Sequence, residues 1–197
     1  ALIGGSVLTR DGLQRLVDRA VAMAKLAPPD PFAGLAAPEQ LVGDVADLDL
    51  VSKTELDMEQ LKALALRAEN AALAVSGVTR SNGGSASASR RHVAMAASNG
   101  FARTWERTGY NISASVVAGE GTSMERDYDG HGATHFEDVE SPEKIGTTAG
   151  ERAVARLNPR KIASQTIPVI YDRRVASSLF GHLLGGISGS AIARGTS

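Results

Sequence analysis

Apolar residues near the start of the chain recur with the spacing of an amphipathic helix. Leu13, Val17 and Ala20 lie on one side of this predicted helix, which ends at Pro28-Pro29. The following segment, 30–54, is rich in Pro, Ala, Asp and Gly, and this composition predicts an extended connection.

A second helix is predicted to begin after Asp57, whose side chain suits an N-cap. Gln60, three residues later, completes the pattern of a capping box. The apolar stripe of this helix consists of Leu61, Leu64, Ala65, Ala68 and Ala72. Gly77 is expected to end the segment, because glycine is common just after helix C-termini.

Beyond Gly77 the apolar period changes from helical to alternating. Residues 78–119 therefore predict an antiparallel β-meander. Between Ile112 and Val116, apolar residues alternate with serines. This alternation predicts a sheet with one buried face and one wetter face.

Two turns are predicted within this meander. Asn99-Gly100 predicts a two-residue hairpin turn, because both central positions of that turn need positive φ. The turn would place Ala96 opposite Arg103 on one face. Thr108-Gly109 predicts the second turn.

The second half of the chain predicts two further helices separated by a short strand at 167–171. Ser141-Pro142-Glu143 supplies an N-cap, a proline at the first helical position and an acid in the first turn. This helix is expected to end at Asn158-Pro159, and residues 175–193 predict a buried helix. Helices and a mainly antiparallel sheet segregated along the chain indicate an α+β fold, an antiparallel β-meander packed with helices.

Three glycines recur at every fourth residue of the last predicted helix: Gly181, Gly185 and Gly189. Each costs about 1 kcal/mol relative to Ala in a helix interior, so a compensating interaction is expected. Glycines at this spacing share one face, where another segment or a peptide backbone can approach closely. Tight core packing and a ligand groove are the two interpretations of this pattern.

The charges are balanced, with 21 Lys+Arg, 22 Asp+Glu and a formal net charge of −1 at pH 7. They are scattered along the sequence, which argues against a nucleic-acid partner, because such a partner needs a concentrated positive footprint. The chain has no cysteine and no run of about eighteen apolar residues that would span a membrane. We therefore expect a soluble, cytoplasmic protein with no membrane partner.

One acidic segment brings possible metal ligands together. Acids from Glu125 to Asp129 match the first places of a calcium loop, but Phe136 stands where the bidentate acid belongs. His131 and His135 have the spacing of zinc ligands on a helix, yet the glycines beside His131 argue against a helix. A metal site is therefore not predicted here, and no Gly-x-Ser-x-Gly elbow between strand and helix supports a serine nucleophile.

Several motifs occur in the order found in the TldD/PmbA family. They are Met124-Glu-Arg-Asp-Tyr-Asp129, Ser141-Pro-Glu143, the segment 150–160, the Gly-rich segment from Asp172 onward and the closing Ala193-Arg-Gly-Thr-Ser197. The chain thus resembles this family, and within it the PmbA (TldE) branch, over nearly its whole length. The resemblance implies a fragment of a larger two-domain protein.

The resemblance also suggests how this fragment is divided. Residues 1–77 would be the end of an amino-terminal α+β domain, with two helices and an extended linker. Residues 78–197 would hold the antiparallel sheet, a helix and the Gly-rich helix, which leads into a carboxy-terminal domain absent from this chain.

The family is one of cytoplasmic metallopeptidases named as modulators of DNA gyrase. In it, the TldD half is implied to bind zinc through a helical His-Glu-x-x-x-His that is followed by Gly-Thr-Ser. If Gly195-Thr196-Ser197 sets the alignment, the ligand positions fall on Phe180, Gly181 and Gly185, which cannot bind zinc. Starting instead at His182 supplies neither of the other two ligands, so His182 is interpreted as a helix-face or interface residue.

The resemblance places a candidate cleft or subunit-interface site in the acidic segment. Arg126 is expected to pair with a carboxylate, and Asp127 or Asp129 to hold loop backbone. A solvated charged turn is the alternative. The full set of candidate cleft or interface residues is Glu120, Arg126, Asp127, Asp129, Gly181, His182 and Gly185, with no catalytic or metal-binding residue among them.

The function expected from the resemblance is that of a non-catalytic subunit in the proteolysis or maturation of small peptides and antitoxins. Its expected partners are a TldD-like subunit that carries the zinc, a second copy of the chain, and an unfolded peptide. The chain itself is expected to hold no cofactor. Two alternatives are a metal-dependent peptidase with ligands outside this fragment or in the acidic segment, and a homodimeric peptide-binding protein.

Overall fold

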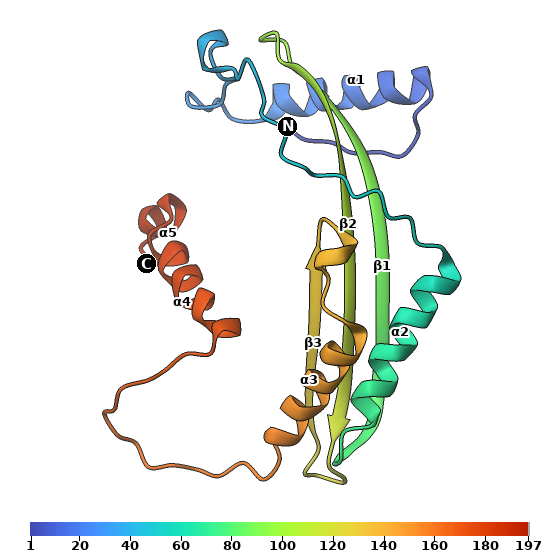
Figure 1. The fold of residues 1–197 in the computed structure, drawn as a ribbon. Helices are drawn as coiled ribbons and strands as arrows, with labels where there is room; N and C mark the ends of the chain where they lie inside the picture. Colours follow the sequence, from blue (N-terminus) through green and yellow to red (C-terminus); the bar gives the residue numbers. More distant parts are fainter. Residues whose placement is uncertain (197) are drawn as a thin grey trace. The chain divides into compact units, whose positions relative to one another are not determined.

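The computed structural model describes residues 1–196 (Figure 1). The chain divides into two compact units, Ala1–Leu157 and Asn158–Ser197. The first contains the sheet, and the second consists of an extended segment followed by two helices. The boundary that the sequence predicts after Gly77 concerns the domains of a longer protein, and it stays a prediction.

Two helices of the first unit, α2 (Met58–Leu73) and α3 (Pro142–Ala155), begin at the predicted capping signals. In chain order, the elements are α1 (Arg10–Leu26), the 3₁₀ turn η1 (Pro38–Gln40), α2 (Met58–Leu73), β1 (Val78–Ala96), β2 (Ala102–Ala118), β3 (Glu125–Ala133), the 3₁₀ turn η2 (Phe136–Asp138) and α3 (Pro142–Ala155). At the start of α2, the Asp57 carboxylate accepts from Gln60 N at 2.8 Å, and Gln60 Oε1 accepts from Asp57 N at 2.9 Å. The predicted capping box is therefore present.

The three strands form one antiparallel sheet in the order β1-β2-β3, which confirms the α+β class. Both helices that pack on this sheet, α2 and α3, lie on the same face (Figure 1). The core between them consists of Leu64, Ala68, Ala72, Ile112, Ala114, Val116, Ala118, Ile145, Ala149 and Ala153. The predicted alternation of buried apolar residues with serines along β2 is confirmed.

Small residues bring the two helices and the sheet into backbone contact. A Cβ atom placed on Gly146 of α3 would lie 2.0 Å from the Ala68 carbonyl oxygen of α2. A Cβ atom on Gly84 of β1 would lie 2.2 Å from the Ala65 carbonyl oxygen. Both distances are shorter than any real Cβ contact, so only glycine fits at these positions.

The turn between β1 and β2 differs from the predicted two-residue turn. A 2.9 Å hydrogen bond from Ala97 N to Phe101 O closes a three-residue loop, in which only the glycine has positive φ. Ala96 therefore lies opposite Ala102, and the predicted pairing with Arg103 is wrong by one residue. The glycine ends a longer turn instead of sharing a tight one with the asparagine.

Two further expectations about the sheet are wrong. Thr108-Gly109 forms no turn, because β2 runs through it and Gly109 pairs with Ser89 of β1. The acidic segment that was expected to be a loop forms strand β3 instead. Its charged residues were misleading because they alternate between the two faces of the sheet, and those on the inner face are paired.

In the second unit, residues 159–172 form no helix or strand, so the strand predicted at 167–171 is absent. The single helix predicted at 175–193 is divided into α4 (Arg173–Gly186) and α5 (Gly189–Arg194). The break occurs because the Ser188 hydroxyl accepts from Ala191 N at 3.3 Å and caps a new helix.

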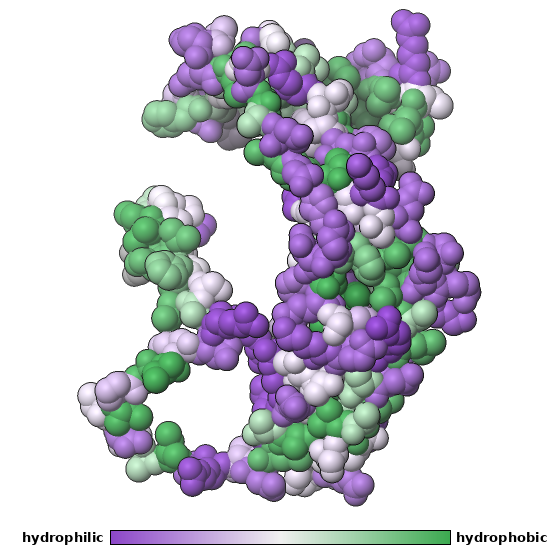
Figure 2. Space-filling model, in the orientation of Figure 1, coloured by the Kyte–Doolittle hydropathy of each residue, from purple (hydrophilic) through white to green (hydrophobic). Residues whose placement is uncertain are grey.

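The apolar side chains of α4 are exposed, which contradicts the prediction of a buried helix. Phe180 is 70% exposed, and the surface of these helices is largely apolar in Figure 2. Ser197, the last residue of the motif used for alignment, lies outside the described residues. Within residues 1–196, none of the helices is long and apolar enough to cross a membrane.

The contact at Gly146 gives a direct test of this packing. In an open helix, Gly→Ala stabilises by about 1 kcal/mol. We expect Gly146→Ala instead to destabilise the protein by about 1–3 kcal/mol, because the new methyl group overlaps the Ala68 carbonyl. Gly181→Ala is the matched control, since a Cβ there meets no atom within 4 Å. Urea unfolding that found both variants equally stable would contradict the packing described.

Candidate functional site: the sheet and its ion-paired strand

Strand β3 carries three of the predicted site residues, and its alternation divides them between two faces. Asp127 and Asp129 face the helices, opposite Val116 and Ala114 of β2. Arg126 lies on the other face and is exposed. The expected role of Arg126 in pairing a partner's carboxylate stays a prediction.

Arg152 of α3 and Arg156, the residue that caps its C-terminus, pair with the acids of β3. Arg152 forms an ion pair with Asp129, and Arg156 lies 3.3 Å from Glu125 and 3.6 Å from Asp127. The Asp127 side chain, which is 6% exposed, also accepts a 2.8 Å hydrogen bond from the backbone N of the next residue. These carboxylates therefore tie β3 to α3 and hold strand backbone.

The two histidines of this region also have protein partners. His131 Nδ1 accepts from Glu140 N at 3.2 Å, and His135 Nε2 donates to Asp49 O at 2.8 Å. Residues 1–196 contain no group of three His, Cys, Asp or Glu side chains placed to bind a metal. The acids of β3 do not suit zinc, because arginines already neutralise them.

The other predicted site residues lie in two different places. Glu120 is exposed in the turn between β2 and β3, where its carbonyl accepts from Ser123 N at 3.1 Å. Gly181, His182 and Gly185 lie on α4, in the second unit. A Cβ atom on either glycine would meet no other atom of this unit within 4 Å. Tight packing and a ligand groove at these glycines both stay predictions.

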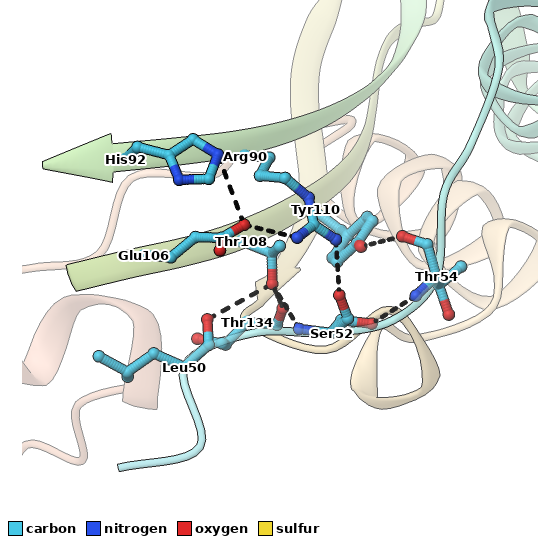
Figure 3. A network of polar contacts seen from close by, with 9 residues as sticks. All are labelled: Leu50, Ser52, Thr54, Arg90, His92, Glu106, Thr108, Tyr110 and Thr134. Atoms are coloured by element: carbon cyan, nitrogen blue, oxygen red, sulfur yellow. Dashed lines mark hydrogen bonds and ion pairs between the residues drawn. The ribbon is translucent and has the colours of Figure 1, made fainter. Parts of the chain in front are cut away.

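A buried polar site that the sequence did not predict attaches segment 49–54 to the hairpin of β1 and β2 (Figure 3). Ser52 is 2% exposed, and its backbone N donates to Thr108 Oγ1 at 2.8 Å. The Thr108 hydroxyl donates its single hydrogen to Thr134 O, also at 2.8 Å. Thr108 N donates to Leu50 O at 3.0 Å, so the segment continues the hydrogen bonding along β2 beyond the end of β3.

Arg90 completes this attachment. Its guanidinium lies 2.5 Å from Glu106 Oε1 and donates to Ser52 O at 3.1 Å (Figure 3). The hydrogen bond with Glu106 raises the pKa of Arg90 above its usual value. The Tyr110 hydroxyl donates to Thr54 O at the other end of the segment. The alternation of side chains along β1 and β2 is enough to predict that Arg90, Glu106 and Tyr110 share one face of the sheet. No local sequence motif predicts that segment 49–54 binds there.

Residues 42–51, which begin before this attachment, border a largely apolar groove of about 570 Å³ against the hairpin near its tip. Val45, Leu48 and Trp105 line it, and each of them is exposed. Arg103 holds the start of this stretch by donating to the carbonyls of residues 42 and 43, at 3.2 and 2.9 Å. The groove is therefore a candidate binding site for apolar side chains of a ligand.

The Thr108 hydroxyl is expected to dominate the stability of this attachment. Thr108→Val keeps the shape of the side chain but leaves the buried Ser52 N–H without its acceptor, and should cost about 1–3 kcal/mol. Thr108→Ser, which keeps the hydroxyl, is the control. Urea unfolding in which the valine variant matched the serine variant would rule out this role.

His135 should make the attachment depend on pH. Its hydrogen bond to the Asp49 carbonyl, together with nearby carboxylates, raises the pKa of His135 above its usual value. Its contribution to stability is therefore fully present below the unfolded pKa and is lost as pH rises through the folded pKa. We expect the difference in melting temperature between the natural protein and His135→Gln to shrink as pH rises; a difference constant with pH would contradict this.

Comparison with known proteins places this fold in a family. Residues 52–157 match the domain described as the PmbA/TldA metallopeptidase central domain. The metalloprotease PmbA of Escherichia coli O157:H7 is 36% identical over 188 residues, covering 95% of this chain and 42% of that protein. The PmbA homolog of Haemophilus influenzae is 32% identical over 193 residues, covering 98% of this chain and 43% of that protein. The chain thus spans less than half the length of these relatives.

Solved structures share the fold. A protein of Bacteroides thetaiotaomicron described as a candidate modulator of DNA gyrase has a TM-score of 0.81 at 23% identity, over 98% of this chain and 45% of that one. TldE of Thermococcus kodakarensis has a TM-score of 0.51 at 19% identity, over 74% of this chain and 31% of that one. The family match over more than half of the chain and the identity to the two PmbA proteins lead to one assignment: the chain belongs to the PmbA/TldA metallopeptidase family, whose central domain matches residues 52–157.

Proposed function

We propose that this chain is part of a PmbA/TldE-like subunit that lacks zinc and acts as the non-catalytic partner of a TldD-like subunit in the cytoplasm. Together the two subunits would cleave or mature small peptides. The observation that carries the proposal is the chemistry at the positions aligned with the zinc motif. Phe180, Gly181 and Gly185 offer no atom that binds zinc.

The polar residues of the central domain support the same proposal. The acids of β3 are paired with Arg152 and Arg156, and the nearby histidines are engaged with backbone atoms. A chain that used these side chains as zinc ligands would have to break the attachment of α3 to the sheet. We therefore assign them a structural role, and we expect the metal to be held by the partner.

The sheet and the groove indicate how this subunit would take part. β1 and β3 are the outer strands of the sheet, so each has an edge with backbone groups available to an additional strand. An unfolded peptide can bind such an edge in extended form, by β-augmentation. The apolar groove beside Trp105 would accept apolar side chains of the same peptide.

The first experiment is an elemental analysis for zinc. The full-length protein, purified alone without chelator, is expected to contain far less than one zinc per chain. It should cleave an unfolded peptide only after a TldD-like subunit from the same genome has been added. The TldD-like subunit purified in the same way is the matched control, and it should retain its zinc.

About one zinc per chain in the protein alone would overturn this proposal. That result would favour a metal-dependent peptidase whose ligands lie outside residues 1–197. A protein that binds no zinc, fails to associate with the TldD-like subunit and forms a dimer by sedimentation would instead be a homodimeric peptide-binding protein.

A further inference from the structure

The sheet separates its charges by face. On the helix-covered face, Glu106 and the three acids of β3 are paired with arginines. The opposite face, here called the open face, carries arginines from all three strands and no acid. Four exposed arginines of this face have no ion pair to any residue of 1–196: Arg80, Arg91, Arg107 and Arg126. A fifth, Arg103, donates to the backbone carbonyls of residues 42 and 43.

Arg91 and Arg107 lie directly opposite each other on β1 and β2. Like charges in this arrangement repel, and they destabilise a strand pair unless another charge compensates them. The backbone of the two strands fixes both side chains on the open face, where the structure supplies no carboxylate within the described chain. A ligand with negative charge is therefore the compensation that this pair lacks.

A polar hollow of about 390 Å³ lies beside the arginine pair. Ser89 and Thr134 line it, and Gly109 and Gly132 leave its floor at the level of the backbone. A Cβ on Gly132 would lie 3.2 Å from Asn111 Nδ2, so a larger residue would fill part of this space. The hollow thus provides hydrogen-bonding groups and room beside two guanidinium groups, which suits planar oxyanions such as carboxylates.

The rest of the open face suits an extended chain. Between the two ends of the sheet, β1 presents exposed serines at 85, 87 and 89, and β2 and β3 add Ser113, Ser115, Asn111 and the exposed Tyr128. Arg80 and Arg126 lie at the end of the sheet opposite the hairpin tip, on either side of Val117. Val117 is ten residues along β2 from Arg107. At roughly 3.3 Å per residue, the two arginine pairs are about 33 Å apart.

This spacing favours a polypeptide over nucleic acid. Phosphates repeat along a nucleic acid every few ångströms, so a bound strand would leave most of its charges unmatched between the two pairs. Asp44 and Asp47, which line the neighbouring groove, would also repel a continuous polyanion. An extended polypeptide can instead place carboxylates at the arginines and small uncharged residues between them.

We propose that the open face binds an extended acidic polypeptide. Its carboxylates are held by Arg91 and Arg107 in the hollow, and by Arg80 and Arg126 at the end of the sheet opposite the hairpin tip. The inference does not rest on the metallopeptidase role, because it depends only on the charges and shape of this face.

The test is the binding of a fluorescein-labelled, end-capped peptide with two glutamates at each end and about ten serines between them, measured by fluorescence anisotropy with the full chain. The same peptide with glutamine in place of glutamate should bind at least about tenfold more weakly at low salt. Arg91→Gln/Arg107→Gln should weaken binding of the glutamate peptide by about tenfold, and added salt should remove most of the difference. Arg15→Gln/Arg19→Gln on α1 removes the same charge elsewhere and should change binding little.

Three results would overturn the proposal. The first is equal binding of the glutamate and glutamine peptides, or equal losses in the two double variants. The second is single-stranded DNA that binds more tightly than the glutamate peptide, since nucleic acid would then be the better ligand. The third is sedimentation of the unmodified protein as a dimer and of the Arg91→Gln/Arg107→Gln variant as a monomer. A second copy of the chain would then cover this face. Circular dichroism of each variant confirms that it is folded.

Discussion

The close approach of α2 to α3 and β1 is the constraint on which the first unit depends. Where Gly146 and Gly84 stand, carbonyl oxygens of α2 occupy the space that a Cβ would need. Helices that approach so closely bury alanines and leave little room for large side chains, so the core gains its stability from dense contact and not from bulky residues. Both helices then share one face of the sheet, and the other face carries no part of this core.

The distribution of charge follows from that one-sided packing. Acids on the inner face lie near α3, and Arg152 and Arg156 at the end of that helix pair with them. Arginines on the other face remain in contact with water, where an unpaired charge costs little. A chain with a formal net charge of −1 can therefore carry a strongly basic surface. Counting charges along the sequence hides this surface, because neighbouring residues of a strand point in opposite directions.

Features that depend on residues close together in the sequence could be predicted, whereas contacts between distant residues could not. The capping box at Asp57, the helix start at Ser141 and the alternation along β2 are local signals, and the structure contains each of them. The family could also be recognised, because its motifs occur in order. The attachment of Ser52 to Thr108 could not, because its partners are 56 residues apart and neither belongs to a motif. β3 was missed for a related reason: its acids look like those of a solvated loop until the arginines of α3 are placed beside them.

The hairpin of β1 and β2 extends past the end of β3, and Thr108 marks the point where segment 49–54 takes over as the neighbour of β2. This arrangement limits how the hairpin can change in evolution. One residue inserted into each strand between Thr108 and the tip would exchange the two faces of everything beyond it, turning Trp105 and Arg103 away from their present surroundings. Two residues in each strand would restore the faces and only move the tip outward. Length changes in this arm are therefore tolerated in even steps, and the reach of the arm can evolve while its surface chemistry is kept.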